Sequence, residues 1–406
     1  MAGNDAADST RAAGHGLDVL NLFVANIQTG FGPFIAVYLT TSGWTQTSIG
    51  IALSIGTIVG MISQVPAGAL VDAVPYKSII AGVSLLAFTV SALLFAIEPL
   101  PLWVYVAEAL HGFSSSTLGP TIAATSLILV GQDALSLRLG RNARFSSLGN
   151  ATGAALMGAF GYYISSRSVF FLAAALTLPA IVSVWPLRRL DGRAPAAHVG
   201  VRVKVSPVSA WHLFRDRRLL IFGAAILLFT FGNSAMLPLA SGAITKLMPA
   251  AASLMIAAFI VLPQFVVAAI SPGVGRYAQS HGRRGLLIVA LAALVVRGVL
   301  FAVIADPVFL IPVQILDGIS GACIGVLIPL VTSDVAGLSG HYNFALGVIG
   351  LALGIGATAS TTVGGMIADR IGEPTALATL AASAVVATLF AWAAMPETRP
   401  PPVNAD

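Results

Sequence analysis

Long apolar stretches, separated by short polar segments, follow one another along almost the whole chain. The hydrocarbon core of a bilayer, about 30 Å thick, needs roughly 20 apolar residues in a spanning helix. We expect twelve such spans, at residues 17–40, 48–71, 78–97, 101–124, 145–165, 168–187, 219–242, 251–270, 285–305, 308–332, 342–367 and 374–395. The pattern predicts an all-α membrane protein with twelve transmembrane helices.

The longest polar segment, residues 188–218, is basic and divides these spans six and six. We expect it to link two six-helix bundles, at residues 17–187 and 219–395. Residues 1–16 are small, polar and mixed in charge, so we expect a disordered cytoplasmic tail there. Residues 396–406 are expected to form a second cytoplasmic tail.

The composition excludes an ordinary soluble domain, because only 9% of the residues are charged and 57% are hydrophobic, whereas soluble proteins carry roughly 25% charge. The 21 Lys and Arg residues exceed the 16 Asp and Glu residues. These bases lie in loops, where they orient a membrane protein rather than bind nucleic acid. The single cysteine, Cys323, excludes a disulfide or a cysteine metal site within the chain. No segment resembles a Walker loop, so we expect no cofactor and no ATP hydrolysis.

The distribution of basic residues predicts the orientation. With a cytoplasmic N-terminus, 17 bases lie inside and three, Arg167, Lys246 and Arg370, lie outside, while Arg297 lies within a span. Basic loops favour the cytoplasmic side. We therefore expect a multi-pass protein of the cell inner membrane with both termini in the cytoplasm.

A sequence repeat relates the two halves. Segments Glu108–Pro120 and Asp317–Pro329 share the pattern acid-x3-Gly-x7-Pro, at an offset of 209 residues. The loops after spans two and eight match at an offset of 207, and spans one and seven match at 205. Matches in the same order indicate a duplicated protein, whose halves are related by an axis along the membrane normal.

With these spans, this basic central loop and these motifs, the chain resembles the major facilitator superfamily of secondary transporters. The resemblance implies two pseudo-symmetric bundles that rock around a cavity lined by spans one, four, seven and ten, in a monomer. The family's fourth-span arginine corresponds to Glu108 here, which is followed by His111 and Gly112. The fifth span is glycine-rich but lacks the proline of the antiporter signature, so it matches that signature only in part.

In this family the loop after span two acts as a latch of a cytoplasmic gate. The first copy has Ala73 and Pro75 where the family has arginine and glycine, and the second has Gln279 for the acid. The resemblance implies that the acid and lysine of the first copy face the two arginines of the second. The implied gate residues are Gly68, Asp72, Lys77, Gly275, Arg283 and Arg284.

Three residues are candidates for proton coupling: Glu108, His111 and Asp317. At 1.5 Å per residue Glu108 lies roughly 10 Å along span four, and His111 shares its helix face. Burial favours the neutral form of a carboxyl, so such an acid can take up and release a proton. The alternative is a neutral acid hydrogen-bonded between helices. Arg297, the one base within a span, could instead neutralise Asp317 as an intramembrane ion pair that serves as a structural lock or a gate.

Polar side chains in spans one and seven are candidates for the substrate cavity. Gln28 and Asn233 occupy matched positions, each five residues before a proline. Asn26 and Ser234 lie beside them, and Gln264 in span eight is a weaker candidate. The alternative is that these groups only form hydrogen bonds between neighbouring helices.

The leading hypothesis is a secondary active transporter, not an enzyme, that couples protons to the export of a small organic solute. Proton symport for metabolite uptake is one alternative. A receptor or lipid-modifying enzyme is another, but it would need a catalytic cluster at a membrane face, and the sequence shows none. Three membrane acids against one base favour neutral or cationic substrates. The expected partners are the solute, protons and membrane lipids, and no metal or nucleic acid.

Overall fold

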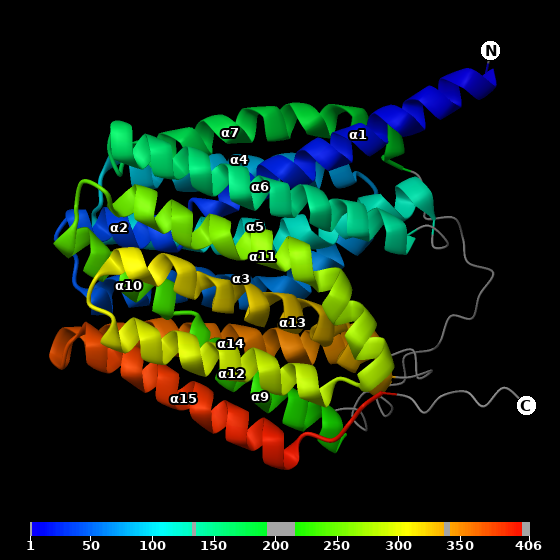
Figure 1. Ribbon diagram of the computed structural model, residues 1–406. Coiled ribbons are helices and arrows are strands. Elements are labelled where there is room, and N and C mark those ends of the chain that lie inside the picture. Colours follow the sequence, from blue (N-terminus) through cyan, green and yellow to red (C-terminus); the bar gives the residue numbers. More distant parts are fainter. Residues whose placement is uncertain (1, 132–134, 193–215, 337–341, 400–406) are drawn as a thin grey trace, which may run out of the picture. The chain divides into compact units, whose positions relative to one another are not determined.

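The computed structural model describes residues 2–131, 135–192, 216–336 and 342–399. Every regular element in these ranges is helical (Figure 1). The elements of the first half are α1 (Ala2–Thr29), α2 (Pro33–Thr41), α3 (Gln46–Ala73), α4 (Lys77–Ile97), α5 (Pro101–Val130), α6 (Leu135–Tyr163), α7 (Ser168–Val184) and the 3-10 turn η1 (Trp185–Leu190). Those of the second half are α9 (Arg217–Asn233), α10 (Met236–Leu247), α11 (Ala252–His281), α12 (Arg284–Val303), η2 (Pro307–Phe309), α13 (Leu310–Ala336), α14 (Tyr342–Arg370) and α15 (Glu373–Ala394).

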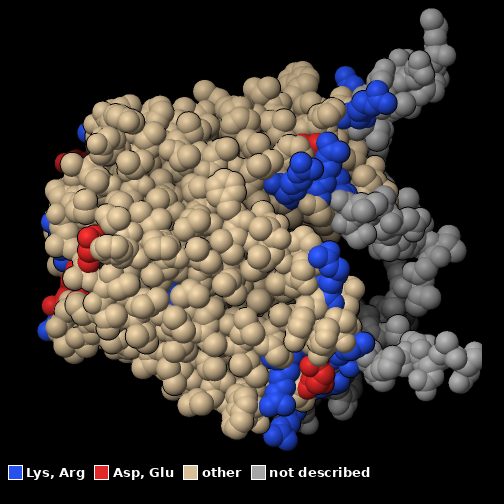
Figure 2. Space-filling model, viewed as in Figure 1, with Lys and Arg blue, Asp and Glu red and all other residues tan. Residues whose placement is uncertain are grey.

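These helices confirm the predicted twelve-helix membrane fold in two bundles. Within the described residues, 11 spans are long and apolar enough to cross a membrane, with α1 and α2 counted together, and likewise α9 and α10. The twelfth helix of the series, α6, carries Arg138, Arg141 and Arg144 in its first half. On the face seen in Figure 2, charged side chains gather near the helix ends, and the stretch between them is almost free of charge.

The contacts divide the chain into two compact units. The first comprises Met1–Trp44, Ile51–Val201 and Ile244–Val261, and the second comprises Thr45–Gly50, Arg202–Ala243 and Leu262–Asp406. The first turn of α3 thus belongs to the second unit, where Asp369 on α14 accepts hydrogen bonds from the backbone N–H groups of Gln46 (2.9 Å) and Thr47 (2.6 Å). Most of the expected linker, residues 188–218, lies outside the described residues. The bundle limits expected from the sequence stay predictions.

The expectation of a disordered N-terminal tail is wrong, because α1 begins at Ala2 and continues without interruption into the first span. Five of the first 13 residues are alanine, which has the highest helix propensity. Extending an existing helix costs little compared with starting one. For the same reason α5 and α11 continue past the ends of their apolar stretches.

The first span is broken at residues 30–32, between α1 and α2 (Figure 1). Gly32 has φ 89° and ψ −104°, a conformation that side chains other than glycine rarely adopt. Pro33 starts α2, where its missing N–H group is not needed. Phe31 lies at the break and packs edge-on against Phe88 and Phe95, with ring centroids 5.8 and 5.9 Å apart.

Glycines bring α6 very close to α1 in the first unit. A Cβ atom on Gly149 would collide with the carbonyl oxygen of Leu22, and one on Gly153 would lie 2.8 Å from the Cα atom of Asn26. Figure 1 shows α1 beside α6 and α7, the helices that it contacts. This close approach fixes which residues of α1 and α6 face the same space.

In each half of the chain an acid that follows the last helix binds the start of the third membrane helix of that half. In the first unit, Asp191 Oδ1 accepts from the N–H group of Ser78 at the start of α4, at 3.1 Å. In the second unit, Glu397 Oε1 and Oε2 accept from the N–H groups of Arg283 (2.8 Å) and Arg284 (3.2 Å) at the start of α12. A negative charge is favourable at a helix N-terminus, where N–H groups lack partners within the helix.

Candidate functional site

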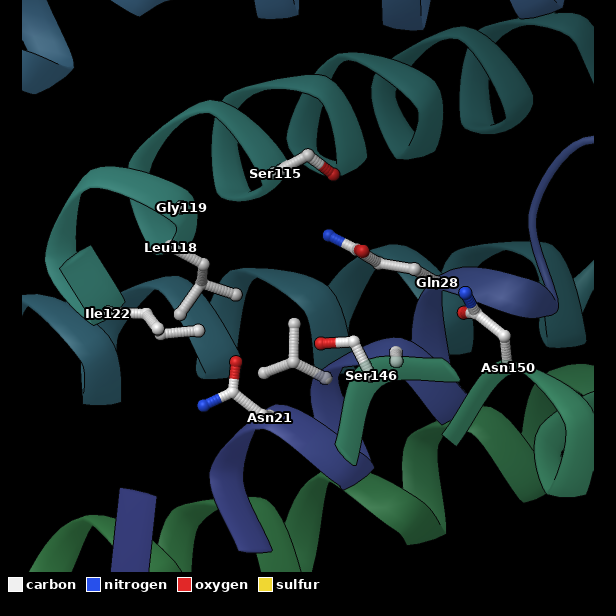
Figure 3. A pocket seen from close by; sticks show the side chains of 10 residues that line it. Asn21, Gln28, Ser115, Leu118, Gly119, Ile122, Ser146 and Asn150 are labelled. Atoms are coloured by element: carbon white, nitrogen blue, oxygen red, sulfur yellow. The ribbon is translucent and has the colours of Figure 1, made fainter. Parts of the chain in front are cut away.

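A cavity of about 380 Å³ lies within the first unit, between α1, α5 and α6 (Figure 3). None of its ten lining residues carries a charge. They are Asn21, Val24, Ala25 and Gln28 from α1, Ser115, Leu118, Gly119 and Ile122 from α5, and Ser146 and Asn150 from α6. The cavity therefore combines helices one, four and five of the membrane series.

Three polar side chains of this cavity, Gln28, Ser115 and Ser146, have no hydrogen-bond partner among the described residues. Figure 3 shows Gln28 extending from α1 toward Ser115 on α5. Polar groups in a membrane bundle need a partner, so these side chains are available to water or to a ligand.

Two asparagines of the cavity each use only one of their two side-chain polar atoms in a hydrogen bond. Asn21 Nδ2 donates to the carbonyl oxygen of Leu17 at 2.7 Å, and its side-chain oxygen has no hydrogen-bond partner among the described residues. Asn150 Oδ1 accepts from the hydroxyl of Thr29 at 3.2 Å, and its amide nitrogen has no partner among the described residues. The cavity thus offers both hydrogen-bond donors and acceptors.

Glu108 and His111 lie together on α5, as their spacing predicts. Glu108 is 2% exposed, and its Oε2 lies 3.5 Å from His111 Nδ1. Oε2 points at α3, since a Cβ atom on Gly56 would collide with it. Oε1 is buried without a hydrogen-bond partner among the described residues. The acid therefore faces a neighbouring helix, and it is not one of the cavity's lining residues.

His111 connects this acid to the break in the first span. Its ring stacks on Phe31, with centroids 4.2 Å apart and planes 12° from parallel. Phe88 also lies near this ring, at a centroid distance of 5.5 Å. Phe31, at the break between α1 and α2, thus contacts the same histidine that lies beside Glu108.

A polar cluster surrounds Arg297 inside the second unit. Arg297 Nη1 donates to Asp317 Oδ1 at 2.7 Å and to Asn233 Oδ1 at 2.5 Å. Its Nε donates to Gln314 Oε1 at 3.0 Å, and the guanidinium lies 5.3 Å from the ring centroid of Phe301. The structure thus brings together the two members of the expected intramembrane ion pair.

The remaining cavity candidates lie in different places. Asn26 is 2% exposed and donates to Thr152 Oγ1 on α6 at 3.3 Å, so it lies between helices rather than in the cavity. Asn233 belongs to the arginine cluster, and Ser234 follows it at the end of α9. Gln264 lies half-buried on α11.

The implied gate residues have partners within their own units. Arg283 pairs with Asp334, at 2.9 Å between Nε and Oδ2, and Arg284 Nη2 donates to the carbonyl oxygen of Trp392. Lys77 Nζ donates to the carbonyl oxygen of Val74 at 2.8 Å and to that of Val71. The side chain of Asp72 lies outside the described part of the chain. Gly68 and Gly275 have open space where a Cβ atom would lie.

One acid near this region has a perturbed pKa. Burial raises the pKa of Glu397, but the N–H groups of Arg283, Arg399, Arg284 and Thr398 bind its carboxylate and bring the pKa below its usual value. Glu397 therefore stays ionised and holds the chain end against the start of α12.

Sequence reasoning missed four polar residues of the cavity: Asn21, Ser115, Ser146 and Asn150. The spacing of polar residues along the sequence could have indicated three of them. Asn21 and Gln28 are seven residues apart, and Ser146 and Asn150 are four apart, spacings that place side chains on one helix face. No group of three or more possible metal ligands occurs among the described residues.

Comparisons with known proteins agree with this architecture. The sequence profile of the Major Facilitator Superfamily matches residues 17–343. An uncharacterized MFS-type transporter, found in two strains of Mycobacterium tuberculosis, is 33% identical over 406 residues, which cover 98% of this chain and 96% of that protein.

Solved structures of similar fold include transporters of different solutes. A mutant of the nucleoside transporter NupG has a TM-score of 0.81 at 15% identity, covering 95% of this chain and 100% of that one. A mutant of the peptide transporter POT has a TM-score of 0.73 at 13% identity, and the match covers 93% of this chain and 94% of that one. A bacterial homolog of the human lysosomal transporter Spinster, in an inward-facing and unoccupied conformation, has a TM-score of 0.74 at 13% identity. The match covers 98% of this chain and 99% of that one.

Proposed function

Because the chain belongs to the Major Facilitator Superfamily and is a membrane transporter rather than an enzyme, we propose that it moves a small organic solute by alternating access, coupled to protons. The observation that carries this proposal is the cavity between α1, α5 and α6, with its unpartnered Gln28, Ser115 and Ser146. Its volume, about 380 Å³, lies in the range of small-molecule sites. Two proteins of similar fold are a nucleoside transporter and a peptide transporter.

Glu108 is the proposed site of proton coupling, with His111 beside it. An ionised carboxylate with an unpartnered, buried oxygen would cost several kcal/mol, so we propose that Glu108 holds a proton while enclosed. A conformation that opens its surroundings to water would let the proton leave. The contact between His111 and Phe31 would then connect the protonation of Glu108 to the break between α1 and α2.

Asp317 is a weaker site for coupling, since Arg297 holds its carboxylate by an ion pair. We propose that this pair, with Asn233, serves as a lock within the second unit. Gln264 and Ser234 remain proposed cavity residues, and Asn26 is proposed to position α6 against α1.

The moving bodies in this proposal are the bundles at residues 17–187 and 219–395, joined by the linker at 188–218. The loops containing Lys77 and Arg283 form the proposed cytoplasmic gate, together with Asp72. The protein would act as a monomer among the lipids of the cell inner membrane, with residues 1–16 and 396–406 in the cytoplasm. The partial antiport signature of α6 supports export in exchange for protons.

The test uses the full chain in liposomes. A thermal-shift screen of metabolites and drugs identifies a solute that binds, and its flux is then measured with and without a pH gradient. Glu108→Gln mimics the protonated acid, so we expect it to exchange the solute between the two sides but to lose accumulation driven by the gradient. Glu98→Gln, an exposed acid after α4, is the matched control and should accumulate like the parent. Accumulation by Glu108→Gln at the parent's rate would mean that the acid is structural.

A further inference from the structure

The chemistry of the cavity lining indicates which solutes it can hold. We infer that the cavity between α1, α5 and α6 takes an uncharged solute with several hydrogen-bonding groups along one edge and an apolar face opposite. This substrate class rests on the proposed transport function, because it concerns the same cavity.

The first step concerns charge. The cavity is lined without a charged side chain. Arg144 on α6, two residues before Ser146, is exposed and is not among the lining residues. Asp18 binds Arg138 and Arg141, both at 2.6 Å, and Glu108 faces α3. A charged solute would thus lose water without gaining an opposite charge, which is unfavourable.

The second step concerns the polar edge. Gln28, Ser146 and Asn150 project from the neighbouring helices α1 and α6, and Ser115 faces them from α5 (Figure 3). Amide and hydroxyl groups can each donate and accept. A solute with only one polar group would leave several of these side chains unpaired, which lowers affinity. The lining therefore selects solutes with multiple hydrogen-bonding groups.

The third step concerns the apolar side. Leu118 and Ile122 lie one turn apart on α5, and Val24 adds a branched side chain from α1. These side chains bury an apolar surface of the solute. A fully hydrophilic solute would gain nothing from them, so the complementary ligand has two different faces.

The experiment compares matched probes that differ mainly in charge. Purified full-length protein is titrated with uridine and uridine monophosphate, methyl glucoside and methyl glucuronide, and alanyl-alanine blocked at both ends and with free ends. The melting temperature reports binding. We expect at least one neutral probe to raise it, with the charged counterpart binding roughly tenfold to a hundredfold more weakly.

Variants assign the binding to this cavity. Ser115→Ala and Gln28→Met should each weaken binding of the neutral probe by roughly fivefold or more. Methionine keeps the side-chain length of Gln28. Ser116→Ala is the matched control, because Ser116 donates to the carbonyl oxygen of Phe113 at 2.7 Å and does not line the cavity. The melting temperatures without probe establish that the variants are folded.

Three results would overturn the inferred class: stabilisation by charged probes alone, no stabilisation by any neutral probe, or binding that survives both cavity substitutions. Measurements of flux in liposomes test the transport proposal separately from the inferred substrate class. Transport of a charged probe would refute the substrate class and leave transport standing. Binding of a neutral probe without flux would refute transport and leave the substrate class standing.

Discussion

At the scale of single residues, the environment of Arg297 leads to a prediction about stability. Its side chain is 2% exposed and depends on Asp317 for charge balance. Neutralising the partner of a buried ion strands the other charge. We expect Asp317→Asn to lower the free energy of unfolding by about 3–5 kcal/mol, seen as a lower melting temperature.

A second ion pair in the same unit provides the control. Arg218 and Asp216 pair at 3.1 Å on the surface, where such pairs contribute about 0–1 kcal/mol. Asp216→Asn should therefore change the melting temperature little. Equal losses in the two variants would show that burial of Arg297 is not what makes its pair important.

Residue spacing predicted part of the site and could not predict the rest. Asn26 and Gln28 are two residues apart and point to nearly opposite sides of α1, so only one of them could line the cavity. Spacing also predicted that Glu108 and His111 share a face. Spacing could not predict that this face is turned to α3, where Gly56 leaves room for the acid. The local sequence around a glycine does not indicate which distant residue packs against it.

At the scale of helices, the break between α1 and α2 depends on one glycine. Because Gly32 has φ 89°, an alanine there would be strained even though open space surrounds it. We expect Gly32→Ala to destabilise the protein by about 1–3 kcal/mol. Gly82→Ala, inside α4 and also in open space, should instead be neutral or stabilise by up to about 1 kcal/mol. Thermal melts of both variants measure the difference, and similar values would argue against strain at the break.

The start of α12 leads to a prediction about pH. The folded-state pKa of Glu397 is lowered from its usual value of 4.5, so its contribution to stability is present above that value and is lost as the pH falls through the lower, folded-state pKa. We expect the parent's melting temperature to fall below about pH 5 more steeply than that of Glu397→Gln, which should already be less stable at neutral pH. Parallel curves for the two proteins would show that the carboxylate does not stabilise α12.

At the scale of the whole molecule, the proposed orientation is tested by labelling single cysteines. With Cys323 replaced by serine, cysteines at Thr41 and Lys246 should react with an impermeant reagent from outside the cell. A cysteine at Ala143, exposed in the first half of α6, should react only after the membrane is opened. Labelling in the opposite pattern would reverse the orientation inferred from the basic loops.

Hydropathy was sufficient to predict the 11 membrane spans that are long and apolar enough to cross the bilayer. It could not predict that α1 starts at Ala2, because a helix outside the lipid needs no apolar stretch. The first span contains Pro33, but the break in the helix depends on the conformation of Gly32. The close approach of α6 to α1 beside the cavity depends on contacts of Gly149 and Gly153 with residues far away in the sequence.

The carboxylate contacts at the starts of α4 and α12 occupy matched positions in the two halves of the chain. Asp191 and Glu397 are 206 residues apart, as are the residues they bind, Ser78 and Arg284. This distance falls among the offsets of the sequence repeat. A contact inherited from a duplicated six-helix unit would show this common offset, and the expected duplication therefore predicts matched contacts at the starts of α4 and α12.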